Sequence, residues 1–457
     1  MSTETIAAIS TGGTNAGINI IRISGDEAEN IINKIFKTNS KLDHQRIVYG
    51  KIVEPETRAV VDEVLVSCFK APHSFTGEDV IEVNTHGGRR VTLDVLELIL
   101  KSGARLAEPG EFSKRAFLNG KMDLSKAEAI IDVINAKTKM QKEIAMCQLQ
   151  GGLENRVKEI RNELVELIAQ IEVNIDYPEY DYEELDKSVL KSILERLKTN
   201  VKQLIKTRED GKYIKEGIDL AIIGGANSGK SSLLNKLAQE ERAIVTDIEG
   251  TTRDVIEESI VVGDLIINVS DTAGIRNTDD VVESIGIKKS LEIIEKTDLV
   301  LYMIDVVKGI TDKDIEIIED IKWKKIPLIA CVNKVDVSYE NIENVKSKIP
   351  EGVAIVEISA NTGHGIETLK QVILEMFNVN DFDKKQEKLV VNERHKQNLL
   401  NAKNNITKAL NCVENDESID ITAIAITEAI EELGNITGEV ASADVVNKIF
   451  EKFCLGK

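Results

Sequence analysis

The order of apolar and polar residues divides the chain into regions of different texture. Over residues 1–120, short runs rich in Ile and Val alternate with glycine-rich turns, which is typical of β-strands in a compact α/β domain. We predict strands at 18–24, 59–69 and 79–84, and a helix at 91–103.

The next region, residues 121–214, changes to a helical pattern. Glycine is nearly absent there apart from Gly151-Gly152, and Pro178 is its single proline. We therefore expect long packed helices, interrupted at these two places. One predicted helix face carries apolar residues at a 3-4-3-4 spacing, namely Val157, Ile160, Leu164, Leu167 and Ile171.

Residues 215–379 return to apolar strands that alternate with helices. The runs IDLAIIGG, LIINVSDTAG, DLVLYMID, IPLIACVNKVD and VAIVEIS are rich in Ile and Val, as strands buried on both faces are. Strands that alternate with helices predict a doubly wound, mostly parallel sheet.

The last region, residues 380–457, is helical again. We expect it to form one bundle with residues 121–214, so that residues 215–379 are inserted into an all-α domain. One face of the predicted helix carries Leu399, Ile406, Leu410 and Val413.

Composition narrows the class of protein. Apolar residues make up 42% of the chain and charged residues 30%, which fits a soluble globular protein. No apolar run approaches the roughly 18 residues of a membrane span, and the N-terminus lacks a basic region followed by an apolar core. We expect a cytoplasmic protein without a membrane span.

Cysteines and charge exclude further classes. The five cysteines are scattered without C-x-x-C pairs, which argues against a structural zinc site and a disulfide framework. A net charge of −20 disfavours a general nucleic-acid binder, because phosphate contacts need Lys and Arg. An RNA partner would require a local basic surface.

Residues 224–231 read GGANSGKS and match the pattern G-x-x-x-x-G-K-[ST], between a predicted strand and a predicted helix. The glycines let backbone N–H groups surround phosphates, and the helix N-terminus favours negative charge. Lys230 is expected to reach the β- and γ-phosphates, and Ser231 to bind Mg²⁺.

Two later segments are expected to complete the phosphate and metal contacts. In residues 271–274 (DTAG), Asp271 is placed near the Mg²⁺ shell, and the Gly274 N–H can sense the γ-phosphate. In residues 246–254 (TDIEGTTRD), Thr252 is expected to close on Mg²⁺ and the γ-phosphate in the GTP state.

The choice of base depends on Asn333-Lys334-Val335-Asp336, at the end of a predicted strand. The Asp336 carboxylate can accept both N1–H and the 2-amino group of guanine, a donor pair that adenine lacks. Ser359 and Ala360 follow the next strand and offer a backbone N–H to guanine O6. Each motif is short, but together, in order and at strand ends, they predict guanine-nucleotide binding.

The motifs thus predict a set of GTP-binding residues. These are Asn227, Ser228, Gly229, Lys230, Ser231, Ser232, Thr246, Asp247, Ile248, Thr251, Thr252, Asp271, Thr272, Ala273, Gly274, Asn333, Lys334, Asp336, Ser359 and Ala360.

Hydrolysis needs a residue that orients the attacking water. Ile275 occupies the position where many GTPases carry a glutamine, and its side chain cannot hydrogen-bond water. Acidic candidates follow at Asp279, Asp280 and Glu283, although this stretch can equally be a solvated loop. No arginine finger is evident, although two arginines lie nearby, Arg253 and Arg276.

Segments inside and outside the nucleotide-binding region resemble the tRNA modification GTPase MnmE (TrmE) family. Inside it these are GGANSGKSSLLN, TDIEGTTRD, DTAGIR, VESIGI and NKVD. Outside it they are PHSFTGEDVIEVNTHGG (72–88), EPGEFSKRAFLNGKMDLSKAEAI (108–130) and the terminal Cys-Leu-Gly-Lys. The resemblance extends over the whole chain.

The resemblance implies a domain order and a cation. Residues 1–120 would bind a tetrahydrofolate and dimerise, and 121–214 and 380–457 would form the helical domain. Residues 215–379 would be the inserted G domain, of the Ras-like P-loop type. Hydrolysis would be stimulated by K⁺ in place of an arginine finger, with Glu283 orienting the water and Lys230 also catalytic. The K⁺ contacts would be Asn227, Thr246, Ile248 and Thr251, and the Mg²⁺ contacts Ser231 and Thr252.

The resemblance also implies a folate site and a partner. Contacts to a 5-formyl- or methylene-tetrahydrofolate would come from Arg22, Glu82, Lys121 and Lys457, with Cys454 as a possible functional thiol. From the sequence alone, the first three would be ordinary charged surface residues. A homodimer would work with MnmG (GidA), which carries FAD, to add an aminomethyl or carboxymethylaminomethyl group at C5 of wobble uridine in tRNA.

A second interpretation is a GTP switch for ribosome assembly without a role in modification, which the P-loop and NKVD alone would allow. Modified nucleosides in bulk tRNA distinguish the two.

Overall fold

The computed structural model describes residues 4–12, 16–176, 187–240, 258–269, 297–379, 382 and 389–457. Contacts divide the chain into two compact units, each described by itself. The first unit comprises Met1–Ile134, Gln148–Gln203 and Glu393–Lys457. The second unit comprises Asn135–Cys147 and Leu204–Asn392.

The first unit begins with a sheet whose strands include the three predicted from the sequence. Their order in the sheet is β3-β4-β5-β6-β2-β1-β7, with antiparallel neighbours except for the parallel pair β1 and β7. The strands are β1 (Ile6–Ile9), β2 (Ile18–Ser24), β3 (Phe36–Lys37), β4 (Arg46–Val53), β5 (Val60–Phe69), β6 (Val80–His86) and β7 (Arg105–Leu106).

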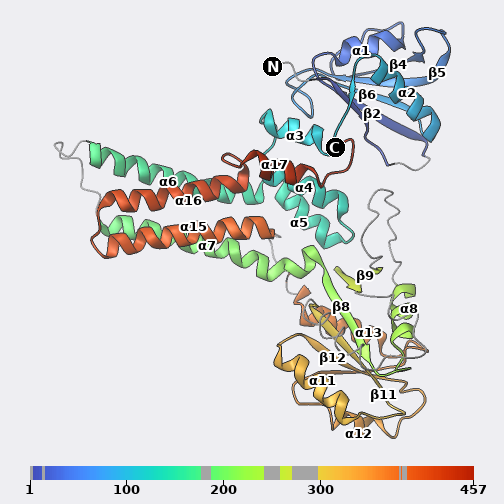
Figure 1. Ribbon diagram of the computed structural model, residues 1–457, viewed down its shortest axis with the longest axis vertical. Helices are drawn as coiled ribbons and strands as arrows, with labels where there is room; N and C mark the ends of the chain where they lie inside the picture. Colours follow the sequence, from blue (N-terminus) through green and yellow to red (C-terminus); the bar gives the residue numbers. More distant parts are fainter. Residues whose placement is uncertain are drawn as a thin grey trace. The chain divides into compact units, whose positions relative to one another are not determined.

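One face of this sheet is covered by α1 (Ala28–Ile35) and α2 (Arg89–Lys101), as Figure 1 shows. Alternate residues of the strands, such as Ile21, Val66 and Val83, are buried against these helices. Burial of alternate residues is expected for a sheet with one covered face.

The opposite face of the sheet is partly open. Ile47, Tyr49 and Leu65 are 67%, 59% and 42% exposed and lie on this face by their register. Toward β1, the same face is covered by Phe112 of α3 (Glu111–Leu118), with Phe75 packed beside it.

The remainder of the first unit is helical, and the predicted helix face at 157–171 is confirmed, since all five apolar residues are buried. Figure 1 shows the long helices lying side by side. The helices are α4 (Leu124–Asn135), α6 (Gly152–Asp176), the first part of α7 (Lys187–Glu216), α15 (Glu393–Glu414), α16 (Ile419–Thr437) and α17 (Ala443–Phe450).

The second unit contains the predicted doubly wound sheet, in the order β13-β12-β11-β8-β10-β9. All neighbouring strands are parallel except β9 and β10, which form a hairpin. The strands are β8 (Ile218–Gly224), β9 (Glu258–Val262), β10 (Leu265–Val269), β11 (Leu299–Asp305), β12 (Leu328–Asn333) and β13 (Ala354–Ile358).

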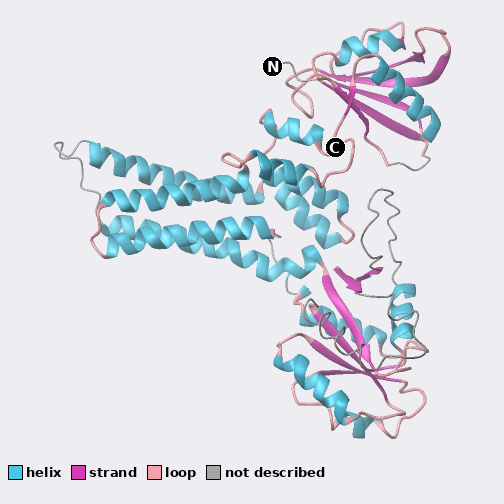
Figure 2. Ribbon diagram, in the orientation of Figure 1, coloured by secondary structure: helices cyan, strands magenta, loops and turns pink. Residues whose placement is uncertain are grey.

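Helices cover both faces of this sheet (Figure 2). One face packs against α8 (Lys230–Glu240) and α13 (Ile366–Met376), and the other against α11 (Asp312–Trp323) and α12 (Ile342–Lys346). Because β8, β11, β12 and β13 are parallel, their carboxyl ends lie at one edge, where ligands bind in such folds.

Helix α5 (Lys139–Leu149) belongs largely to the second unit, although the helical pattern of the sequence grouped it with residues 121–214. Met140 and Ile144 are buried in the same core as strands β8 to β13. The Met140 N–H donates to Asp264 Oδ1 at 3.0 Å, and Gln141 Nε2 donates to the Lys215 carbonyl at 3.1 Å. Among the described residues, no helix is long and apolar enough to cross a membrane.

Candidate functional site

The loop between β8 and α8 has the backbone of a phosphate-binding loop. Gly224, Asn227 and Gly229 have φ angles of 147°, 59° and 101°. Asparagine tolerates the left-handed region better than most residues, and glycine enters it freely. The sequence GGANSGKS therefore supplies suitable residue types at the three positions where the loop turns.

Two of these glycines lie too close to neighbouring atoms to carry a side chain. A Cβ atom on Gly224 would be 2.3 Å from the Met303 carbonyl oxygen. A Cβ atom on Gly229 would be 2.1 Å from Asn333 Nδ2. The loop is thus packed tightly against β11 and the end of β12.

Lys230 begins α8 and folds its side chain back over the loop. Its ammonium group donates to the carbonyl oxygens of Gly224 and Gly225, both at 2.9 Å. Burial lowers the pKa of Lys230, because the charged form loses water. An anionic ligand at the loop would favour the charged ammonium.

Asn333 joins the phosphate-binding loop to the segments after β12 and β13. Its Nδ2 donates to the Ser228 carbonyl at 2.7 Å, and its Oδ1 accepts from the Ala360 N–H at 2.9 Å. The side chain is buried, so both hydrogen bonds are shielded from water. One amide therefore fixes three segments that are distant in sequence.

Lys334 is held by a residue that the sequence analysis did not select. Its Nζ lies 2.7 Å from Asp305 Oδ2 at the end of β11. Burial raises the pKa of Asp305, but Lys334, the Val307 N–H and the charge of Lys308 together lower it, so the net shift of the pKa is downward. The signal available in the sequence was an aspartate at the end of the run DLVLYMID, one strand before NKVD.

The predicted base-recognition residues meet at the same edge of the sheet. Asp336 is exposed to solvent, whereas Ser359 and Ala360 are buried. The Ser359 N–H donates to the His364 carbonyl, and the Ala360 N–H donates to Asn333. Both N–H groups thus already have acceptors within the protein, and a hydrogen bond from this segment to guanine O6 stays a prediction.

The described part of the site fits a nucleoside triphosphate with Mg²⁺. A Cβ atom on Gly225 would meet open space, and the side chains of Asn227, Ser231 and Ser232 are exposed. The loop leads directly into the N-terminus of α8. Such a loop offers N–H donors to phosphate oxygens, and a serine hydroxyl is a suitable ligand for a hard cation.

The other predicted nucleotide, metal and hydrolysis residues lie outside the described residues. They are Thr246, Asp247, Ile248, Thr251, Thr252, Arg253, Asp271, Thr272, Ala273, Gly274, Ile275, Arg276, Asp279, Asp280 and Glu283.

In the first unit, the sheet brings Arg22 and Glu82 together. They are directly opposite each other on β2 and β6, and their side chains form an ion pair with distances of 2.9 and 3.0 Å. The Arg22 guanidinium carbon lies 5.1 Å from the ring centre of Phe75 and 5.7 Å from that of Phe112. Both charged residues were expected from the family resemblance, but neither their ion pair nor the two neighbouring aromatic rings were predicted.

The remaining expected folate contacts lie on two further segments. Lys121 follows α3, and its Nζ donates to the Pro72 carbonyl at 2.8 Å. Near Lys457, the Gly456 carbonyl accepts from Ser10 Oγ at 3.0 Å. The tail thus lies beside β1, which pairs with β2 through Ala8 and Arg22, and Cys454 is exposed.

Two family models together match almost the whole chain. Residues 5–121 match the family described as GTP-binding protein TrmE N-terminus, and residues 124–454 match the MnmE helical domain. The tRNA modification GTPase MnmE of Thermoanaerobacter pseudethanolicus is 44% identical over 99% of both chains. That of Acetivibrio thermocellus is 46% identical, also over 99% of both.

The chain belongs to the MnmE family of tRNA modification GTPases. Its enzyme class is therefore that of a GTP hydrolase that acts in tRNA modification. Among solved structures, a variant of Aquifex aeolicus Era bound to GDP and AlF4⁻ is 25% identical over 41% of this chain and 66% of its own. Its TM-score is 0.27, which is too low to support any conclusion.

Proposed function

We propose that this MnmE-family chain is a K⁺-stimulated GTPase that installs aminomethyl or carboxymethylaminomethyl groups at C5 of tRNA wobble uridine. It would act with the FAD-containing protein MnmG and use a tetrahydrofolate as the one-carbon source. The observation that carries the GTPase part is the buried Asn333 amide, which links the phosphate-binding loop to the NKVD and Ser359-Ala360 segments.

Nucleotide binding would use the main chain of residues 224–231 for the phosphates and Asp336 for guanine. Mg²⁺ bound to the triphosphate would neutralise charge on the phosphates, with Ser231 and Thr252 as its protein contacts. Lys230 would turn from the two carbonyls that it now contacts to the β- and γ-phosphates.

Potassium would be held by Asn227 together with Thr246, Ile248 and Thr251. The exposed Asn227 side chain at the rim of the loop supports this assignment. A cation there would supply positive charge at the position where other GTPases use an arginine finger. Glu283 would orient the attacking water, since Ile275 cannot.

The folate would bind in the first unit, at Arg22, Glu82, Lys121 and Lys457. The Phe75 ring beside Arg22 supports this assignment, because it is only partly buried and a flat heterocycle can pack against such a ring. Cys454, three residues before Lys457, is the candidate thiol in this region.

The assembly would be a cytoplasmic homodimer that contacts both MnmG and tRNA. The open sheet face with Ile47, Tyr49 and Leu65 supports dimerisation through residues 1–120. Residues 121–214 and 380–457 would be the helical domain and 215–379 the G domain.

The test of the GTPase proposal is the rate of GTP hydrolysis in K⁺ and in Na⁺, for the wild type and Asn227→Ala. We expect faster hydrolysis in K⁺ and a loss of about a hundredfold in Asn227→Ala, the usual size for one group that stabilises transition-state charge. Asn344→Ala, an exposed asparagine of α12, is the matched control and should keep the wild-type rate.

Equal wild-type rates in the two salts, or an unchanged rate in Asn227→Ala, would rule out the potassium mechanism. The modification role is tested separately by nucleoside analysis of tRNA from a deletion strain. Unmodified wobble uridine should accumulate there, whereas a normal nucleoside profile would favour the ribosome-assembly interpretation.

A further inference from the structure

The loop of residues 72–78, which connects β5 to β6, contacts two of the proposed folate-binding residues. Phe75 packs beside Arg22, and the Pro72 carbonyl accepts a hydrogen bond from Lys121. The positions of both basic groups therefore depend on the conformation of this loop.

The 72–78 loop is closed by its own short polar side chains. Ser74 Oγ donates to the Glu78 carbonyl at 2.5 Å and accepts from the Gly77 N–H at 3.0 Å. Thr76 Oγ1 accepts from the Glu78 N–H at 3.2 Å and lies 2.7 Å from Ser24 Oγ. These bonds fix the shape of the loop and attach it to β2.

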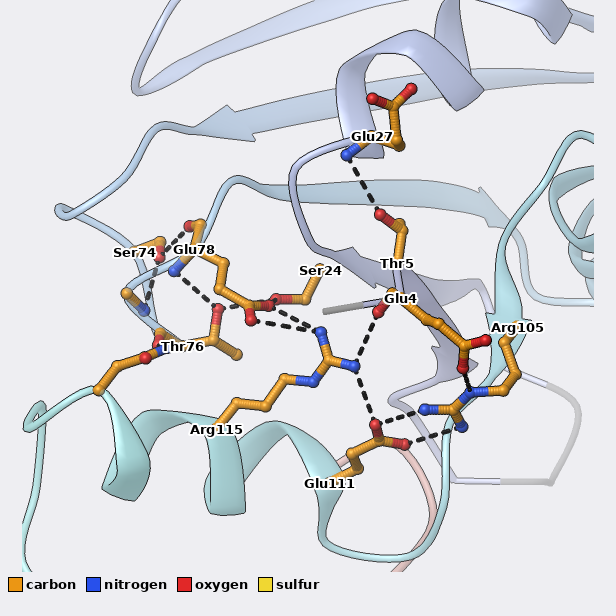
Figure 3. A network of polar contacts seen from close by, with 12 residues as sticks. Glu4, Thr5, Ser24, Glu27, Ser74, Thr76, Glu78, Arg105, Glu111 and Arg115 are labelled. Atoms are coloured by element: carbon orange, nitrogen blue, oxygen red, sulfur yellow. Dashed lines mark hydrogen bonds and ion pairs between the residues drawn. The ribbon is translucent and has the colours of Figure 1, made fainter. Parts of the chain in front are cut away.

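The loop is attached to α3 by a buried arginine, shown in Figure 3. Arg115 Nη1 lies 3.3 and 3.0 Å from the two carboxylate oxygens of Glu78. Its Nη2 donates to Glu111 Oε1 at 2.9 Å and to the Glu4 carbonyl at 2.8 Å. The side chains of Arg115 and Glu78 are only 9% and 11% exposed.

A second arginine belongs to the same cluster but does not contact the loop. Arg105 donates to both carboxylate oxygens of Glu111, at 3.1 and 2.7 Å, and to Glu4 Oε2 at 2.8 Å. Both arginines thus contact Glu111 and Glu4, but of the two it is Arg115 that also contacts Glu78 of the loop (Figure 3).

A buried ion pair of this kind need not stabilise the fold, because the free energy lost when both charges leave water offsets much of their mutual attraction. Its geometry, in contrast, is specific: the rigid guanidinium plane fixes the direction of Nη1, which contacts Glu78, relative to Nη2, which contacts Glu111 and the Glu4 carbonyl. The Arg115–Glu78 pair therefore restricts where the end of the 72–78 loop can lie relative to α3, from which Phe112 also projects toward Arg22.

We propose that Arg115 and Glu78 are positioning residues of the folate site, which act by fixing the 72–78 loop so that Phe75 and Pro72 orient Arg22 and Lys121. This inference rests on the proposed folate binding. It adds two charged residues that would not themselves touch the folate.

The test is the Kd of 5-formyltetrahydrofolate for the full-length protein by calorimetry. Arg115→Met and Glu78→Gln should each weaken folate binding by about ten- to a hundredfold. This is the size expected if the displaced Arg22 or Lys121 loses one hydrogen bond to the folate. Arg115→Lys should recover only part of the affinity, because one ammonium cannot reach Glu78, Glu111 and the Glu4 carbonyl together, which Arg115 contacts through two nitrogens. The double variant Arg115→Met/Glu78→Gln removes both charges of the pair and should fold, yet should still bind folate weakly.

Arg105→Met is the matched control. It removes a guanidinium from the same cluster and from the same carboxylate of Glu111 but leaves the Arg115–Glu78 pair, so the folate Kd should stay within about twofold of the wild type. Hydrogen exchange should be faster in the 72–78 loop of Arg115→Met and unchanged there in Arg105→Met. The Kd for GTP, measured on the same samples, should not change in any variant.

Three results would contradict the inference. They are a wild-type folate Kd in folded Arg115→Met and Glu78→Gln, full recovery in the double variant, or an equal loss in Arg105→Met. Absence of folate binding by the wild-type protein is a different result, and it would overturn the folate part of the proposed function together with this inference.

Discussion

At the scale of single residues, the nucleotide site depends on the close contact between Gly229 and Asn333. Gly229 combines a left-handed φ of 101° with a Cβ position only 2.1 Å from Asn333 Nδ2. The same amide group binds the Ser228 carbonyl. A methyl group at position 229 would therefore disturb the backbone and the Asn333 bridge together.

We accordingly predict that Gly229→Ala weakens GTP binding by roughly 5- to 150-fold, since one strained residue of this kind costs roughly 1–3 kcal/mol. Titration calorimetry with GTP measures the effect. Gly17→Ala is the control, because Gly17 is exposed with no atom near its Cβ position. Wild-type affinity in Gly229→Ala would show that the loop can rearrange without loss.

At the scale of elements, a largely buried polar cluster centred on Arg394 joins three helices of the first unit. Glu128 on α4 lies 2.9 Å from Arg394 Nη2 and 2.7 Å from His395 Nε2 at the start of α15. Arg394 also donates to the carbonyls of Asn435 and Ile436 on α16. Burial raises the pKa of Glu128, but the neighbouring His395 and Arg394 lower it more strongly, to well below its usual range.

This lowered pKa predicts an acid-sensitive contribution to stability. A depressed folded-state pKa stabilises the fold above the unfolded-state pKa, about 4.3 for glutamate, and the contribution is lost as pH falls below that value. We expect Glu128→Gln to be less stable than the wild type at pH 7, by roughly 3 kcal/mol, because it removes the carboxylate that neutralises the Arg394 guanidinium. The difference should shrink between about pH 5 and pH 3.

Urea unfolding followed by circular dichroism at several pH values measures this dependence. The control is Glu414→Gln, which removes an exposed carboxylate paired with Lys191, and it should change stability little. A constant difference between Glu128→Gln and the wild type across this pH range would contradict the assignment to Glu128.

At the scale of the whole molecule, the chain alternates between its two compact units. The segment Asn135–Cys147 lies with Leu204–Asn392, although the sequence on both sides of it belongs to the other unit. The N-terminus of α5 is held by Asp264 in the turn between β9 and β10. Thr138 Oγ1 also accepts from the Gln141 N–H at 3.1 Å, so both contacts satisfy free N–H groups of the first turn.

We predict that Asp264→Ala lowers the stability of the second unit by about 1 kcal/mol, as loss of a helix-capping acceptor usually does. Asp264→Asn keeps an acceptor oxygen and should remain close to the wild type. Hydrogen exchange of residues 139–149 measures the effect directly. Equal protection of α5 in Asp264→Ala and the wild type would mean that apolar packing of Met140 and Ile144 alone holds the helix.

The sequence by itself determined the helices, the strands and the phosphate-binding loop, because each depends on residues that are close together in the chain. Periodicity of apolar residues predicted the buried face at 157–171 and the parallel strands. The residues of GGANSGKS are contiguous, so the turn that they form follows from their own backbone preferences. Asp336 of NKVD likewise lies close behind its strand, since β12 ends at Asn333.

Only the tertiary structure decided which distant charges meet. Arg22 and Glu82 are paired by sheet register, Arg115 and Glu78 by the packing of α3, and Lys334 and Asp305 by adjacent strands. Sixty, thirty-seven and twenty-nine residues separate these partners. Hydrophobic periodicity places a residue on a face, but strand order and register, which are set by long-range packing, determine its neighbour.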